Sequence, residues 1–64
     1  MPIVTVHSRP HTLAERTDLV ARVTEAVVTA YGVSPDAVQV FLVEADDEHW
    51  ARGGRLGGLK KARP

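Results

Sequence analysis

The sequence predicts an α+β fold in which a single βαβ unit is followed by a C-terminal hairpin. Two short stretches rich in β-branched and other apolar residues, 3–7 and 38–45, predict strands. Between them lies an apolar pattern with helical spacing, bounded by helix start and stop signals. Paired glycines at 53 and 54 are typical of a tight hairpin. A chain of 64 residues is expected to form one domain, 1–64.

The first strand carries apolar groups on both of its faces. Ile3, Val4 and Val6 place side chains alternately on the two sides, which is typical of a strand covered on both sides. Residues 8–11 predict a loop, because Pro10 disfavours a helical conformation at Arg9.

The helix is predicted to begin after Thr12. Thr12 and Glu15 have the spacing of a capping box, in which each side chain accepts a hydrogen bond from the backbone of the other. The apolar stripe of the helix follows at intervals of three, four and seven residues, with Leu13, Val20, Val23, Val27 and Ala30. Gly32 suits the left-handed position that ends such a helix.

The second strand again has apolar residues on both faces. One face carries Val38, Val40 and Leu42, and the other carries Gln39, Phe41 and Val43. The order strand, helix, strand implies a parallel pair of strands. One helix covers one face of a two-stranded sheet, so we expect other copies of the chain to cover the second face.

Composition narrows the classes of function. The chain has no cysteine, and its three histidines are not spaced as metal ligands, so we expect no metal and no cofactor. The formal net charge is zero, which disfavours a nucleic-acid partner. No apolar run is long enough to span a membrane and no secretory leader is recognisable, so we expect a cytoplasmic protein without a membrane partner.

Pro2 directly follows Met1. Removal of Met1, which a small second residue favours, would leave a secondary amine at the end of the first strand. Such an amine is a base whose charge change lies near neutral pH, because α-amino groups titrate only slightly above it and burial favours the uncharged form. By position alone, however, Pro2 fits an ordinary exposed terminus better.

Three segments together change that interpretation. Met1-Pro2-Ile3, the strand 38–44, and the run His-Trp-Ala-Arg-Gly-Gly-Arg-Leu at 49–56 resemble the tautomerase superfamily, specifically its short 4-oxalocrotonate tautomerase type. The resemblance covers nearly the whole chain. It implies mature chains that start at proline, and βαβ protomers that assemble as a homohexamer. It also implies that Pro2 is a catalytic base that moves a proton between carbons through an enol.

The resemblance also implies substrate-binding residues. The family places one arginine in the loop before the helix and another on the second strand, which reach one site from different subunits, and an aromatic wall before the Gly-Gly pair. The corresponding residues here are Arg9 or His11, Gln39 and Trp50. Glutamine cannot offer a bidentate cationic fork, so the sequence does not favour a dicarboxylate substrate.

Arg52, together with Arg55, is a hypothetical source of the missing positive charge. Each binding residue also has a plainer interpretation. Trp50 and Gln39 would suit a contact between subunits. His11 would suit an ordinary loop histidine, and the two arginines would suit solvated charges on a hairpin.

These observations predict a cofactor-independent isomerase that acts on a small carboxylate with an enol or 2-oxo group. Two alternatives remain open. One is hydration or hydrolytic dehalogenation, in which a protonated Pro2 acts as an acid and a carboxylate activates water. The other is an inactive subunit that has kept only the fold and the assembly.

Overall fold

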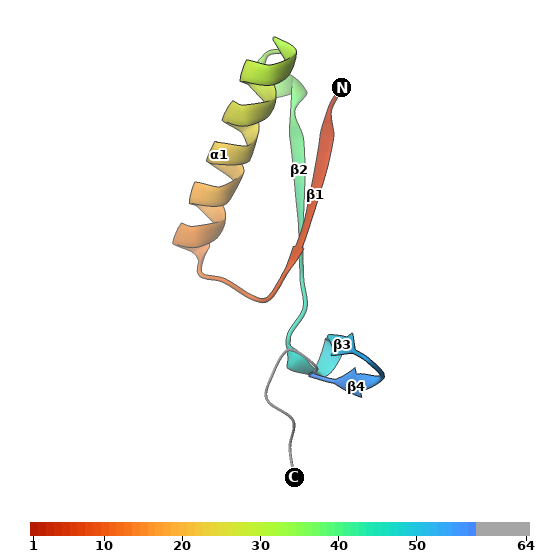
Figure 1. The fold of residues 1–64 in the computed structure, drawn as a ribbon. Coiled ribbons are helices and arrows are strands. Elements are labelled where there is room, and N and C mark those ends of the chain that lie inside the picture. Colours follow the sequence, from red (N-terminus) through yellow and green to blue (C-terminus); the bar gives the residue numbers. More distant parts are fainter. Residues whose placement is uncertain (58–64) are drawn as a thin grey trace.

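The computed structural model describes residues 1–57, which form the predicted βαβ unit and hairpin (Figure 1). Strand β1 spans Ile3–Ser8, helix α1 spans Leu13–Tyr31 and strand β2 spans Gln39–Glu44. Short 3₁₀ turns at Pro35–Ala37 and Asp47–His49 precede β2 and the hairpin, respectively. The hairpin consists of β3, Ala51–Arg52, and β4, Arg55–Leu56. For residues 60–64 the sequence predicts a basic tail, which lies outside the described residues.

Strands β1 and β2 form the predicted parallel pair. Their register runs from Ile3 opposite Gln39 to Ser8 opposite Glu44. One further backbone hydrogen bond extends the ladder at each end, from the Gln39 N–H to the Pro2 carbonyl and from the Ala45 N–H to the Ser8 carbonyl, both at 3.0 Å. Pro2 is therefore fixed to the sheet through its own carbonyl group.

Both ends of α1 follow the sequence signals. The Glu15 N–H donates to Thr12 Oγ1 at 3.1 Å, and the Thr12 N–H donates to Glu15 Oε1 at 3.0 Å, which confirms the capping box. Gly32 ends the helix in the left-handed conformation, with φ of 68°, and its N–H donates to the Val28 carbonyl at 2.9 Å. These caps fix where the loop from β1 enters the helix.

The two faces of the sheet differ in exposure. Along both strands exposed and half-buried residues alternate, and the half-buried set includes Val40 and Leu42. On the opposite face Ile3 is 60% exposed, Phe41 53% and Val43 44%. None of residues 1–57 is fully buried. The part of one chain that the structure describes therefore contains no closed hydrophobic core.

The β3–β4 hairpin lies beyond the end of the sheet that is opposite the N-terminus (Figure 1). Gly53 and Gly54 both have positive φ, 62° and 78°, as a two-residue turn of this kind requires. Among the described residues, no helix is both long enough and apolar enough to traverse a bilayer.

Candidate active site

The N-terminal end of the sheet holds Pro2 and Gln39. Pro2 is half-buried and immediately precedes β1. The Gln39 backbone binds the Pro2 carbonyl, and the Gln39 side chain extends toward the terminus, where its Nε2 lies 3.1 Å from Met1 Sδ. A neutral hydrogen-bond donor therefore lies beside the residue whose removal would expose the Pro2 nitrogen.

The opposite end of the sheet holds Arg9 and Trp50. The Arg9 guanidinium carbon lies 4.9 Å from the centre of the Trp50 ring, a cation–π contact. Arg9 Nη1 also lies 2.5 Å from Asp47 Oδ1, and the Arg9 side chain is 24% exposed. Arg9 is thus held between an aromatic ring and a carboxylate, and part of its charge is already compensated.

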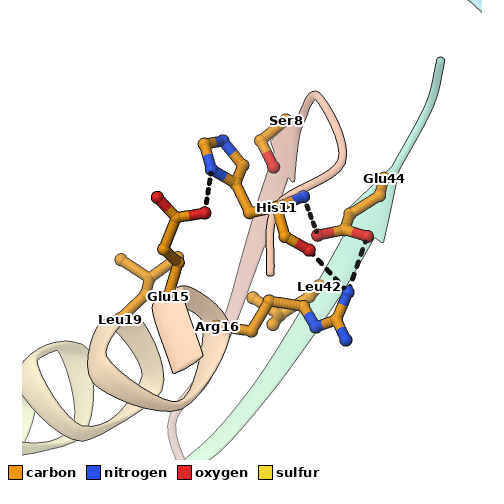
Figure 2. Close-up of a pocket in the computed structure, with 7 residues that line it drawn as sticks. All are labelled: Ser8, His11, Glu15, Arg16, Leu19, Leu42 and Glu44. Atoms are coloured by element: carbon orange, nitrogen blue, oxygen red, sulfur yellow. Dashed lines mark hydrogen bonds and ion pairs between the residues drawn. The ribbon is translucent and has the colours of Figure 1, made fainter. Parts of the chain in front are cut away.

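A pocket of about 340 Å³ opens at the same end of the sheet, between α1 and the ends of both strands (Figure 2). Its lining residues are Ser8, His11, Glu15, Arg16, Leu19, Leu42 and Glu44. Two carboxylates organise its polar side. Glu44 accepts from the His11 N–H and from Arg16 Nη1, each at 3.2 Å, while His11 Nδ1 lies 3.2 Å from Glu15 Oε1.

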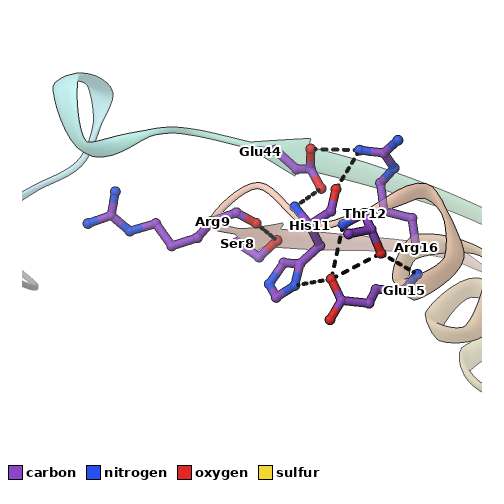
Figure 3. Close-up of polar contacts among 7 residues, drawn as sticks. All are labelled: Ser8, Arg9, His11, Thr12, Glu15, Arg16 and Glu44. Atoms are coloured by element: carbon purple, nitrogen blue, oxygen red, sulfur yellow. Dashed lines mark hydrogen bonds and ion pairs between the residues drawn. The ribbon is translucent and has the colours of Figure 1, made fainter.

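Arg9 does not take part in this network. Its side chain points away from the group formed by His11, Glu15 and Glu44 (Figure 3). The two residues predicted for the loop before the helix therefore face different surroundings. Arg9 contacts the Trp50 ring, whereas the His11 ring lines the pocket.

Two carboxyl groups at this end have perturbed acidity. The Thr12 N–H, followed by the His11 ring, stabilises the Glu15 carboxylate and lowers its pKa below the usual 4.5. A hydrogen bond from the His49 ring, 2.6 Å away, lowers the pKa of Asp46 below the usual 3.8. Both groups therefore remain ionised at neutral pH and add negative charge around the loop end of the sheet.

Arg52 lies on β3, is exposed, and stands opposite Arg55 of β4. It is two residues beyond Trp50, so it belongs to the same end of the molecule as Arg9 and His11.

The predicted site residues thus form two groups within one chain. Pro2 and Gln39 lie at one end of β1, and Arg9, His11, Trp50 and Arg52 lie at the other. The six residues of β1 separate the two groups by about 20 Å. A single copy of the chain therefore does not bring the proline and the tryptophan wall together.

Sequence reasoning missed three residues that organise the loop end, namely Arg16, Glu44 and Asp47. Glu44 had a usable signal, because it continues the inward-facing series of Val40 and Leu42 as a carboxylate. Asp47 lies in an acidic run whose individual partners the sequence does not distinguish. Arg16 looked like one of several charges on the exposed face of the helix.

Comparison with known proteins supports one family. The family model described as tautomerase enzyme matches residues 2–59. Among solved structures, YwhB, a homologue of 4-oxalocrotonate tautomerase, is 33% identical with a TM-score of 0.81, covering 94% of this chain and 100% of its own. No match was found among the curated proteins.

Two further solved structures agree. Another 4-oxalocrotonate tautomerase homologue is 28% identical with a TM-score of 0.84, covering 97% of this chain and 100% of its own. A structure from a study of the 4-oxalocrotonate tautomerase isozymes of Methylibium petroleiphilum is 30% identical with a TM-score of 0.80, covering 91% of this chain and 92% of its own. The family model and these structures, together with the βαβ fold that begins at Pro2, show that the chain belongs to the tautomerase family, in its 4-oxalocrotonate tautomerase type.

Proposed function

We propose that the protein is a cofactor-independent isomerase in which Pro2, after removal of Met1, acts as a general base. It would transfer a proton within an enol, a dienol or a 2-oxo acid. The observation that carries the proposal is the position of Pro2. It is half-buried and held at the start of β1, at the residue where the family model also begins.

The chemistry needs a base that is uncharged near neutral pH and close to the carbon that loses its proton. Partial burial opposes the charged form of an amine. The side chains beside Pro2 in its own chain, Gln39 and Ile3, carry no charge that would favour protonation or deprotonation. The Gln39 amide can donate a hydrogen bond to the oxygen on which negative charge develops.

The rest of the site would come from another copy of the chain, and we propose a homohexamer. One chain leaves Ile3, Phe41 and Val43 exposed and keeps Pro2 away from Trp50. Association through this apolar face would remove it from water, and it would allow the loop end of one copy to approach the proline end of another.

In this arrangement the loop end supplies binding. Trp50 would contact the apolar part of the substrate, while Arg9, His11 and Arg52 would provide donors and positive charge for a carboxylate. The proposed substrate is a small carboxylate with an enol or 2-oxo group.

The test is ketonisation of the enol of phenylpyruvate by protein whose intact mass shows that Met1 is absent. Alkylation of the terminal amine should abolish the reaction. Pro2→Ala leaves a primary amine that is still a base but is no longer held by the pyrrolidine ring, so kcat/KM should fall by up to about a hundredfold, the smallest contribution expected of a well-positioned general base. Pro35→Ala, at the start of a turn outside both groups of site residues, is the matched control and should keep the wild-type rate. No rate above buffer with a broad set of enols would instead favour an inactive assembly subunit.

Hydration or dehalogenation is less favoured by the residues near Trp50. That chemistry needs a carboxylate to activate water, and the segment 51–57 contains Arg52 and Arg55 but no acid. Asp47, which precedes Trp50, is engaged by Arg9.

A further inference from the structure

Arg52 and Arg55 stand directly opposite each other across the β3–β4 hairpin. Directly opposed residues of an antiparallel pair have Cβ atoms about 5 Å apart and point to the same face, and like charges in this position repel each other. The turn between them consists of Gly53 and Gly54 with positive φ, which keeps the two strands close. The hairpin therefore places two positively charged side chains next to each other on one face, where like charges repel.

Within residues 1–57 these are also the arginines whose charge is not compensated. The other three described arginines each have a carboxylate partner, in the pairs Arg9–Asp47, Arg16–Glu44 and Arg22–Asp18. Neither Arg52 nor Arg55 makes an ion pair in this part of the chain, and both are exposed. An anion bound between them would relieve their mutual repulsion.

Trp50 lies on the same face of the hairpin. Its backbone is extended, with φ of −135° and ψ of 118°, so the alternation of side chains places Trp50 and Arg52 on one side. The Gly57 N–H donates to the Trp50 carbonyl at 2.6 Å, which continues the hairpin ladder past the tryptophan. The side chains of Trp50, Arg52 and Arg55 therefore share one face of the hairpin.

We propose that Arg52 and Arg55 form a clamp for the carboxylate of the substrate, with its apolar body against Trp50. Arginine suits this task because its fork can bind a carboxylate through two parallel hydrogen bonds. Arg9 keeps its proposed place among the donors for the carboxylate, and its contact with Trp50 also positions the ring. The enol or 2-oxo nature of the ligand rests on the proposed function; the clamp itself requires only a carboxylate joined to an apolar group.

Binding can be measured without turnover. Trp50 is the only tryptophan of the chain, so its indole N–H resonance reports on the clamp in a titration with benzoate. Arg52→Gln and Arg55→Gln should each weaken benzoate binding by about tenfold, as expected for loss of a hydrogen bond to a charged group. Lysine at either position should restore part of the affinity. Arg22→Gln removes the same charge from α1 and should leave binding unchanged.

Kinetics give the second readout. With the enol of phenylpyruvate, Arg52→Gln and Arg55→Gln should raise KM by a similar factor and leave kcat close to the wild-type value, and the KM of the variants should depend less on salt. Benzoate affinity that is equal in wild type, both glutamine variants and Arg22→Gln would overturn the clamp. If benzoate binds as predicted but no enol is ketonised, the clamp stands and the proposed isomerase function fails.

Discussion

Glu15 serves two neighbours at once at the start of α1. Its Oε1 accepts the Thr12 N–H at 3.0 Å and lies 3.2 Å from His11 Nδ1. The first contact closes the capping box, and the second fixes the His11 ring at the pocket. One carboxylate thus links the local stability of the helix to the placement of a predicted substrate-binding residue.

The lowered pKa of Glu15 predicts that its contribution to folding stability depends on pH. Because folding lowers its pKa below 4.5, the ionised side chain stabilises the folded state above that value, and the contribution is lost as the pH falls through the folded-state pKa. Glu15→Gln should therefore lower the midpoint of thermal unfolding at neutral pH, and the difference from wild type should shrink below pH 4.5.

The control is Glu25→Gln, which changes an exposed glutamate of the same helix. Unfolding should be followed at a fixed protomer concentration, because association would contribute to stability. A stability difference for Glu15→Gln that stays constant from neutral to acidic pH would refute the assignment.

Whole elements were more predictable than individual contacts. The capping box, the C-terminal Gly32 and the Gly53–Gly54 turn act within a few residues, so the sequence alone located α1 and the hairpin. Both strands were expected within one or two residues of their observed bounds, and the parallel pairing followed from the element order.

The contacts at the loop end were not predictable in the same way. The Arg9–Asp47 pair joins residues that are distant in sequence and meet only because β1 and β2 end side by side. The Glu44 contacts to His11 and Arg16 have the same origin. Sequence patterns describe local preferences and faces, whereas the choice among several acids depends on the folded path of the chain.

The exposed apolar face of the sheet leads us to predict that copies of the chain associate through it. Phe41 is 53% exposed within one chain, and its side chain would lie between copies in the proposed assembly. Phe41→Asp would bury an unpaired charge at that contact, which should raise the dissociation constant of the assembly at least about tenfold. Analytical ultracentrifugation over a range of concentrations measures this change.

Thr29→Asp is the matched control, because Thr29 is an exposed residue on the polar side of α1 and should tolerate a charge. A wild-type protein that sediments as a folded single chain at all concentrations would contradict the proposed association.

In the proposed function, the catalytic base and the binding surface lie at opposite ends of one chain. The proline end would offer a base and a neutral amide, and the loop end would offer Trp50 and the arginines. The two ends face each other only if copies of the chain assemble. This arrangement makes association a condition of the proposed activity.

The proposed mechanism requires that Pro2 provides an uncharged terminal amine at neutral pH. The most direct measurement is an NMR titration of the Pro2 nitrogen in isotopically labelled protein, on a sample whose intact mass shows that Met1 has been removed. We expect the amine to lose its proton below or near neutral pH, and we expect enol ketonisation to rise over the same interval. An amine that is still protonated at the pH of full activity, or active protein that retains Met1, would contradict it.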